Sequence, residues 1–277
     1  MKLSILAATA GLLCLTGLSW AAGSGVATNG EPERAVEWVT IHGGKFMMGA
    51  DDVYDAKPVH EASVKTFQIS KTLVTVEQYA QCMVQGKCAP PDMGWNCNYW
   101  HWLKTDPGRD LRHDPINCVD FDRAQQYAAF MEARLPTETE WEYAAKSEGQ
   151  ALKYPWGDDA PSCEKAVIDS NGGPGCGART TLPVCSKPAG NTAQGLCDMA
   201  GNVREWVQDK YQQSYAETPA DGGAFEARGS GRVLRGGAFS DSYRMGMSAD
   251  FRTDSRRYGN PFDHQADVGF RLAETIP

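Results

Sequence analysis

The chain has 277 residues and a formal net charge of −8 at pH 7. An acidic chain with no run of Lys or Arg lacks the basic surface that attracts nucleic acids and anionic membranes, so neither is expected as a partner. The length suits one large domain or two small ones and is sufficient for a sizeable hydrophobic core.

The first residues have the pattern of a secretory signal peptide. Lys2 is followed by an apolar stretch from Leu3 to Leu18, and Ser19 and Ala21 place small side chains before a cleavage site. The stretch is short for a membrane span, so a retained anchor is the less favoured alternative and no membrane insertion is expected. We therefore divide the chain into a signal peptide (1–21), a flexible leader (22–35) and one folded domain (36–277) of a periplasmic or secreted protein.

Cysteines indicate the same compartment. Of nine cysteines only Cys14 lies in the signal peptide, and the remaining even number is typical of disulfides in an exported protein. None forms a CxxC pair and the five histidines are scattered, so a zinc site is the weaker interpretation. The sequence alone does not choose among the many connectivities. Closeness favours Cys82–Cys88, Cys163–Cys176 and Cys185–Cys197, and elimination leaves Cys97–Cys118.

The first predicted elements are strands. Residues 38–41 are aromatic or β-branched, as in a strand, and are followed by a Gly43-Gly44 turn, so residues 45–49 are expected to return as the second arm of a hairpin. Residues 64–69 alternate between polar and apolar side chains, as a half-buried strand does.

Three helices follow. Thr75 and Gln78 form a capping box at the start of the first helix. Asp122 is the expected N-cap of the second, in which apolar residues recur at helical spacing. Thr137 and Glu140 form a second capping box at the start of the third helix.

Residues 89–113, between the first two helices, are irregular and rich in aromatic side chains, including Trp95 and Trp100. A loop of this length is usually functional when it is not disordered. Two interpretations stay open, namely a binding face and packing beneath a disulfide. Beyond Ser147 periodicity fades, and short strands are predicted near 203–207, 232–237 and 268–273. The whole is an α+β domain.

Five motifs resemble those of the formylglycine-generating (sulfatase-modifying factor) family, in the family's order. They are RLPTETEWEYAA (134–145), YPWG (154–157), GLCDMAGNVREW (195–206), RVLRGGAF (232–239) and VGFRLA (268–273). The resemblance extends from Val36 to the C-terminus. It implies a variant C-type-lectin-like fold with little regular secondary structure and calcium as a structural ion.

The resemblance does not extend to the family's copper chemistry. Members that make formylglycine hold copper between two cysteines, and by register these positions fall on Asp241 and Gly246. No cysteine follows Cys197. Copper(I) prefers thiolates, so we expect neither copper nor formylglycine formation. The related ergothioneine sulfoxide synthases use a three-histidine iron site, and the histidines here lack the spacing for it.

The resemblance also implies a calcium site. Its ligands match this chain at Asp198, Gly201, Val203 and Glu205. Two carboxylates and two backbone carbonyls suit a hard cation with oxygen ligands. A plain turn capped by Asp198 is the alternative.

The segment after RVLRGGAF replaces the family's active site. A carboxylate beside hydroxyl groups can act as a base, although a loop without chemistry is the alternative. Arg204 stands where the family usually has Trp, and it is either simply exposed or contacts an acidic ligand. The expected catalytic residues are Ser240, Asp241 and Arg252, and the expected substrate-binding residues are Arg204, Tyr243, Arg244, Trp95 and Trp100.

The exported branch of the family without the cysteine pair implies two functions. PvdO-type members act in the oxidative maturation of the pyoverdine siderophore chromophore. TagR-type members act upstream of a type VI secretion kinase. The first, our leading hypothesis, implies oxidation of a peptide-like small molecule with an unidentified redox cofactor. The second implies a non-catalytic module that binds a periplasmic protein partner.

Overall fold

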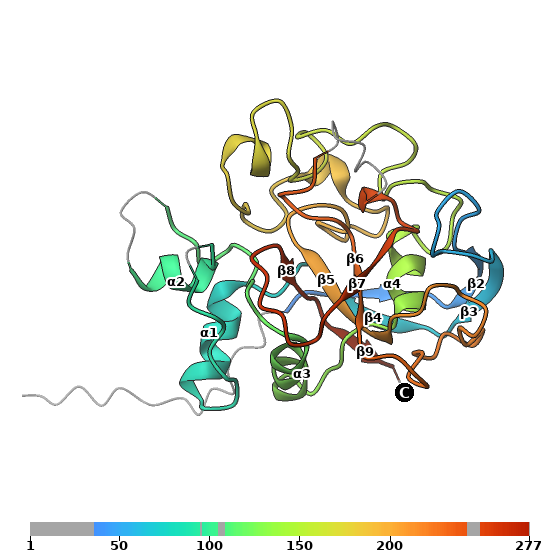
Figure 1. Cartoon of the computed structure of the whole chain (residues 1–277), viewed down its shortest axis with the longest axis horizontal. Helices are drawn as coiled ribbons and strands as arrows, with labels where there is room; N and C mark the ends of the chain where they lie inside the picture. Colours follow the sequence, from blue (N-terminus) through green and yellow to red (C-terminus); the bar gives the residue numbers. More distant parts are fainter. Residues whose placement is uncertain (1–35, 95, 105–108, 243–249, 277) are drawn as a thin grey trace, which may run out of the picture. The chain divides into compact units, whose positions relative to one another are not determined.

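The computed structural model describes residues 36–276 apart from 95, 105–108 and 243–249. In this part of the chain, short strands and helices alternate with long loops (Figure 1). The mixture of helices and sheets confirms the α+β class. No helix among the described residues is long and apolar enough to cross a bilayer. The predicted signal peptide and leader lie outside the described residues.

Three small sheets are formed within the described residues. The first has the order β1-β4-β9, made of β1 (Trp38–Ile41), β4 (Phe67–Ser70) and β9 (Ala273–Thr275). The second pairs β2 (Gly44–Met48) with β3 (His60–Val64). The third has the order β7-β6-β5-β8, made of β5 (Arg204–Lys210), β6 (Arg232–Arg235), β7 (Arg256–Gly259) and β8 (Val268–Gly269).

The predicted hairpin over residues 38–49 is wrong. β1 pairs with β4, with Val39 opposite Ile69, whereas β2 pairs with β3 in a different sheet. The strand predicted at 64–69 is likewise split between β3 and β4. The break between β1 and β2 and the break between β3 and β4 lie where two backbone segments cross closely. The closeness is seen at Gly43, where an added Cβ would lie 2.5 Å from the carbonyl oxygen of Val64. Gly43 is therefore needed for a close crossing of two backbones and not for a hairpin turn.

The helices are α1 (Val76–Val84), α2 (Asn98–Leu103), α3 (Phe121–Phe130) and α4 (Glu138–Ala145). Both predicted capping boxes, at Thr75 and Thr137, are confirmed. The predicted N-cap of α3 is wrong. Asp120, two residues before Asp122, accepts the backbone N–H of Arg123 at 2.8 Å, because the buried Phe121 already occupies the first turn. Helix α2 lies in the aromatic segment that was expected to be irregular.

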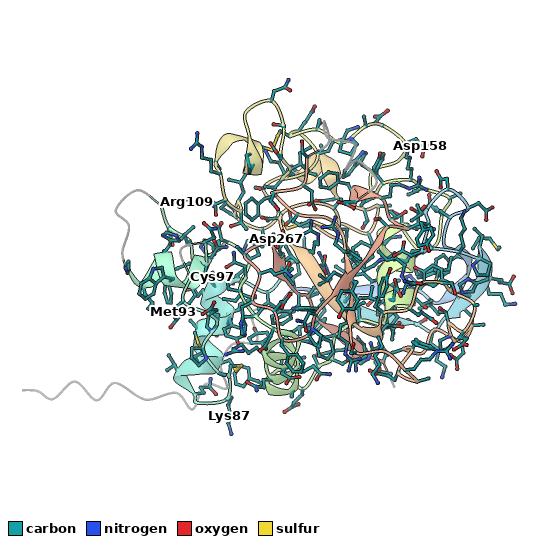
Figure 2. All side chains as sticks on the ribbon, in the orientation of Figure 1. Lys87, Met93, Cys97, Arg109, Asp158 and Asp267 are labelled. Carbon is teal, nitrogen blue, oxygen red and sulfur yellow. A yellow bond between two sulfur atoms is a disulfide. The ribbon has the colours of Figure 1, made fainter. Side chains whose placement is uncertain are left out.

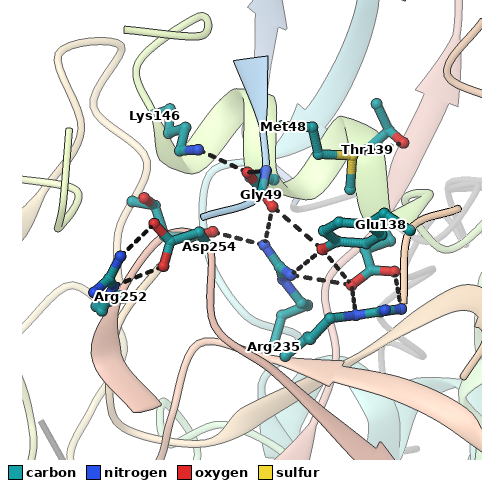
Figure 3. A network of polar contacts seen from close by, with 12 residues as sticks. Met48, Gly49, Glu138, Thr139, Lys146, Arg235, Arg252 and Asp254 are labelled. Carbon is teal, nitrogen blue, oxygen red and sulfur yellow. Dashed lines mark hydrogen bonds and ion pairs between the residues drawn. The ribbon is translucent and has the colours of Figure 1, made fainter. Parts of the chain in front are cut away.

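Helix α4 is buried along its whole length and packs against β2, β3, β5 and β6. Its carboxylates are buried too. Glu138 and Glu142 form ion pairs with Arg235 of β6, and Glu138 also pairs with Arg256 of β7 (Figure 3). This network joins the central helix to the third sheet.

Disulfides fasten the loops outside the sheets. The structure contains Cys82–Cys88, Cys97–Cys118, Cys163–Cys176 and Cys185–Cys197. These are the pairs that closeness and elimination favoured. Crosslinks of this kind stabilise a domain in which loops, rather than regular elements, carry much of the chain.

Candidate functional site

A cleft of about 680 Å³ lies beside the segment that replaces the family's active site. One wall comes from the α2 region, with Asn96, Asn98 and Arg109. The opposite wall comes from residues 174–180, and the floor from residues 239–240 and 266–267. The cleft has the size of a typical site for a small molecule.

Disulfides hold both walls. Cys97, the N-cap of α2, is bonded to Cys118 just before α3. Cys176, inside the 3₁₀ turn Pro174–Gly177, is bonded to Cys163. The two walls, which lie far apart in sequence, are therefore each crosslinked to a neighbouring segment (Figure 2 labels Cys97, Arg109 and Asp267).

Two glycines give the floor its shape. Gly236 and Gly237 have φ values of +93° and +66°, a region that costs glycine little. The turn that follows brings the Asp241 carboxylate back to the backbone N–H of Ala238, at 2.8 Å. Ser240 is left facing the cleft, whereas Asp241 points into the protein and is 2% exposed.

A buried arginine connects the carboxylates of this region. Arg204, at the start of β5, donates to Asp241 on one side and to Oδ2 of Asp267 on the other, at 2.5 Å. The hydroxyl of Ser240 also donates to Oδ2 of Asp267, at 3.0 Å. Burial raises the pKa of Asp241, and the neighbouring Arg204 charge opposes that rise. The result is a fixed arrangement in which Asp267, rather than Asp241, lines the cleft.

The structure changes the interpretation of two expected residues. Arg204 is 4% exposed, so the expectation of an exposed arginine is wrong. Its guanidinium already has two carboxylate partners. Asp241 does not line the cleft, and its role is to hold Arg204. Both residues act on the cleft through Asp267, which the sequence reasoning missed. The sequence shows only that Asp267 lies directly before the VGFRLA motif. This position does not predict its contacts with Arg204 and Ser240.

Arg252 is not brought to this site. It donates to both oxygens of Asp52, at 2.7 and 2.9 Å, and to both oxygens of Asp254, at 2.7 and 2.9 Å. It lines a separate cavity of about 370 Å³ next to Lys146 (Figure 3). Because its donors are occupied there, Arg252 forms no catalytic group with Ser240 and Asp241.

The aromatic residues contribute less than expected. Trp100 is half-buried, its ring lies 4.0 Å from Nζ of Lys104, and it is not among the described residues that line the cleft. Trp95, Tyr243, Arg244 and Gly246 lie outside the described residues. The side chains that α2 and its flanks do supply are polar apart from Leu111. They include Arg109, which the sequence reasoning also missed.

The expected calcium ligands lie close to one another but are partly occupied. Asp198 has a left-handed backbone (φ 54°) and accepts the N–H of Cys185 at 2.8 Å. Glu205 is fully buried, and its two oxygens accept from Nε and Nη2 of Arg271, at 2.6 and 3.0 Å. Burial raises the pKa of Asp198 to about 6. Of these two carboxylates, only Glu205 forms an ion pair with Arg271.

This arrangement fits calcium only in part. No Lys or Arg of the described residues forms an ion pair with Asp198, so a cation there would neutralise a buried charge. Glu205 would have to share its oxygens with Arg271. The described residues contain no group of three or more His, Cys, Asp or Glu that could hold a metal ion. Calcium bound by Asp198, Glu205 and the carbonyls of Gly201 and Val203 stays a prediction.

The residues do not fit copper(I). All eight cysteines of the described residues are in disulfides, so none of them offers a thiolate. At the family's first cysteine position, Asp241 is an acid paired with Arg204. A carboxylate prefers harder cations than copper(I).

Comparisons with known proteins agree with the motifs. Residues 24–276 match the model of the sulfatase-modifying factor enzyme 1-like domain. The chain is 30% identical to the formylglycine-generating enzyme of Streptomyces coelicolor, over 85% of this chain and 88% of that protein. It is 31% identical to the serine/threonine-protein kinase Pkn1 of Chlamydia trachomatis, over 87% of this chain but only 38% of the kinase.

A solved structure is similar as well. The structure of PvdO from Pseudomonas aeruginosa superposes with a TM-score of 0.71 at 28% identity, over 87% of this chain and 95% of PvdO. Motifs, family model and fold agree over most of the chain. The protein therefore belongs to the family of the sulfatase-modifying factor enzyme 1-like domain.

Proposed function

We propose that the protein is a periplasmic accessory factor in the oxidative maturation of a secreted peptide siderophore of the pyoverdine type, without formylglycine-generating activity. The observation that carries this proposal is the replacement of a thiolate position by the Arg204–Asp241 pair beside a cleft that is still open. A cleft lies beside this segment, while the described residues offer no thiolate ligand for copper. The similarity to PvdO supports the choice of substrate class.

The cleft residues would bind and orient the ligand. Oδ1 of Asp267 has no partner among the described residues, so it can accept an N–H or O–H of the ligand. Arg204 and Ser240 both donate to Oδ2 and fix the direction of this carboxylate. In the oxidation two electrons and two protons leave the ligand, and dioxygen is reduced to hydrogen peroxide. Asp267 is the group placed to accept one of the protons.

Deletion of the gene tests the function. In a producing strain, we expect the secreted siderophore to be replaced by a precursor that is heavier by the mass of the hydrogens that oxidation removes, measured by mass spectrometry. Wild-type protein should restore the product and Asp267→Ala should not. A matched control is Asp159→Ala, because the Asp159 side chain is 85% exposed and its ion pair, with Lys165, lies outside the cleft. An unchanged product in the deletion strain would exclude the proposal.

The compartment is part of the proposal. Four disulfides are typical of proteins that fold in an oxidising compartment. We expect the processed protein in the osmotic-shock fraction of Gram-negative cells, with all its described cysteines oxidised. Recovery of the protein with free thiols from the cytoplasm would contradict this location.

A second function is favoured by one comparison. The match to 38% of a serine/threonine-protein kinase shows that a similar domain occurs joined to a kinase. The alternative is therefore a non-catalytic module that binds a protein partner and regulates a kinase. It predicts that Asp267→Ala complements the deletion fully, and that crosslinking in intact cells captures a kinase, identified by mass spectrometry, with wild type and variant alike.

A further inference from the structure

We infer that the ligand of the cleft is dipolar, with an ammonium or other hydrogen-bond donor held at Asp267 and a carboxylate held at Arg109 and Arg179. This inference rests on the proposed function, because it names the chemistry of the ligand that the same cleft would take. The inference follows from a comparison of the charged groups of the cleft that already have partners in the protein with those that still have open donors or acceptors.

The floor has one acceptor in excess. Arg204 is a single cation between two carboxylates, Asp241 and Asp267. Both oxygens of Asp241 are used, by Arg204 and by the backbone N–H of Ala238. For Asp267 only Oδ2 has partners among the described residues, and its side chain is 22% exposed. A donor on the ligand would complete this set.

The α2 wall has donors in excess. Arg109 uses Nη2 for the fully buried Asp114, at 2.5 Å, and for the carbonyl of Thr181, at 2.6 Å. Its Nε and Nη1 have no acceptor among the described residues, and its side chain is 29% exposed. Asp114 is held in turn by the hydroxyl of Thr181, at 2.5 Å. Arg109 is thus anchored through Nη2 and keeps Nε and Nη1 open, and each of these can donate one charge-assisted hydrogen bond to a carboxylate.

The opposite wall adds a second cation. Arg179 lines the cleft, is exposed, and has no side-chain partner among the described residues. Its backbone is left-handed (φ 63°), and its N–H donates to the carbonyl of Pro174 at 2.8 Å. The loop is held by the Cys163–Cys176 disulfide. Two arginines from different walls and one carboxylate on the floor therefore present opposite charges to one ligand.

Tripeptides test this charge pattern directly. The probes are Gly-Tyr-Gly with both ends free, its N-acetyl form and its C-terminal amide, titrated into the ¹⁵N-labelled, disulfide-bonded chain and followed by NMR. We expect the free peptide to shift the amide signals of Ser240, Asp267 and Arg179. Capping either end should weaken binding by about three- to fivefold, the effect of one partly exposed ion pair.

Variants assign each end to its partner. Asp267→Asn should remove the advantage of the free amino group and keep that of the free carboxylate. Arg109→Gln together with Arg179→Gln should do the reverse. Arg228→Gln and Asp159→Asn are matched controls, because these side chains are 69% and 85% exposed and lie outside the cleft. Melting curves check that each variant is folded.

The outcomes separate this inference from the proposed function. Equal affinity for capped and free peptides, binding elsewhere, or no binding would overturn the dipolar ligand, whatever the deletion strain secretes. Selective binding with an unchanged siderophore in the deletion strain would keep the dipolar ligand and exclude the siderophore. Loss of both charge preferences in the control variants would also overturn the inference.

Discussion

Two regions of the molecule both contain arginines and carboxylates: the ion-pair network around α4, and the cleft. They differ in how many of their arginine donors already have an acceptor. In the network, Arg235 donates to Glu138, Glu142, the hydroxyl of Tyr215 and the carbonyl of Thr253. In the cleft, Arg109 uses only one of its donor groups and Arg179 uses none with the described residues. Arginines with several buried acceptors hold elements together in the interior. Arg109 keeps two open donor groups beside its pair with Asp114, and Arg179 has no side-chain partner among the described residues, so both can contact a ligand.

The largest effect should follow from breaking the network at Glu138. This carboxylate accepts from both Arg235 and Arg256, and all three side chains are at most 2% exposed. Glu138→Gln removes a negative charge that two buried guanidinium groups share. It should lower the free energy of unfolding by about 3–5 kcal/mol. Urea denaturation measures this change. Glu61→Gln, at an exposed pair with Lys45, should cost far less, because water screens this pair. Equal losses in the two variants would refute the comparison.

The next effect concerns pH. Burial and the nearby Glu138 charge raise the pKa of Asp209 to about 7. The folded state then holds a proton that the unfolded state has released, so stability falls as pH rises from about 4 to 7. The slope contributed by this group should approach about 1.4 kcal/mol per pH unit, and Asp209→Asn should flatten the curve. Denaturation at a series of pH values measures both. Parallel curves for wild type and variant would disprove the raised pKa.

Calcium should have a smaller effect. A cation that binds the folded state stabilises it by mass action, by about 2.7 kcal/mol at a hundredfold excess over Kd. We expect calcium to raise the melting temperature and a chelator to lower it. Asp198→Asn should abolish the response, because Asp198 is the ligand without a competing arginine. A wild-type melting curve that does not respond to calcium would contradict the calcium site. Glu205 would then be a partner of Arg271 and not a calcium ligand.

The sequence predicted the features that depend on neighbouring residues. Each capping box spans four residues and each motif at most twelve, and the disulfides join cysteines 6 to 21 residues apart. The structure contains these capping boxes and disulfides. The prediction failed where partners are distant. Gly43 crosses the chain at residues 64–66, Arg204 meets a carboxylate at position 267, and Arg252 is held by Asp52. Such contacts arise from tertiary packing, for which a single sequence has no local signal.

The candidate site shows the same limit. Ser240 was found because it follows a motif, and it does line the cleft. Asp241 was expected to be a catalytic residue, but it is buried and paired with Arg204. Asp267, Arg109 and Arg179 carry no motif. Their importance appears only once the loops that hold them are placed around one cleft.

The smallest expected effect, none at all, concerns copper. A sulfatase-type Cys-x-Pro-x-Arg peptide should not be converted to formylglycine, with or without copper, because Asp241 occupies a thiolate position and all described cysteines are in disulfides. Mass spectrometry of the peptide after incubation measures this, with the Streptomyces coelicolor enzyme as the positive control. Replacing Asp241 by Cys should not create activity either, since Arg204 would then lose a buried partner and the second family position, Gly246, would still lack a thiolate. Formylglycine in either sample would contradict the conclusion that this chain lacks the residues for copper-dependent chemistry.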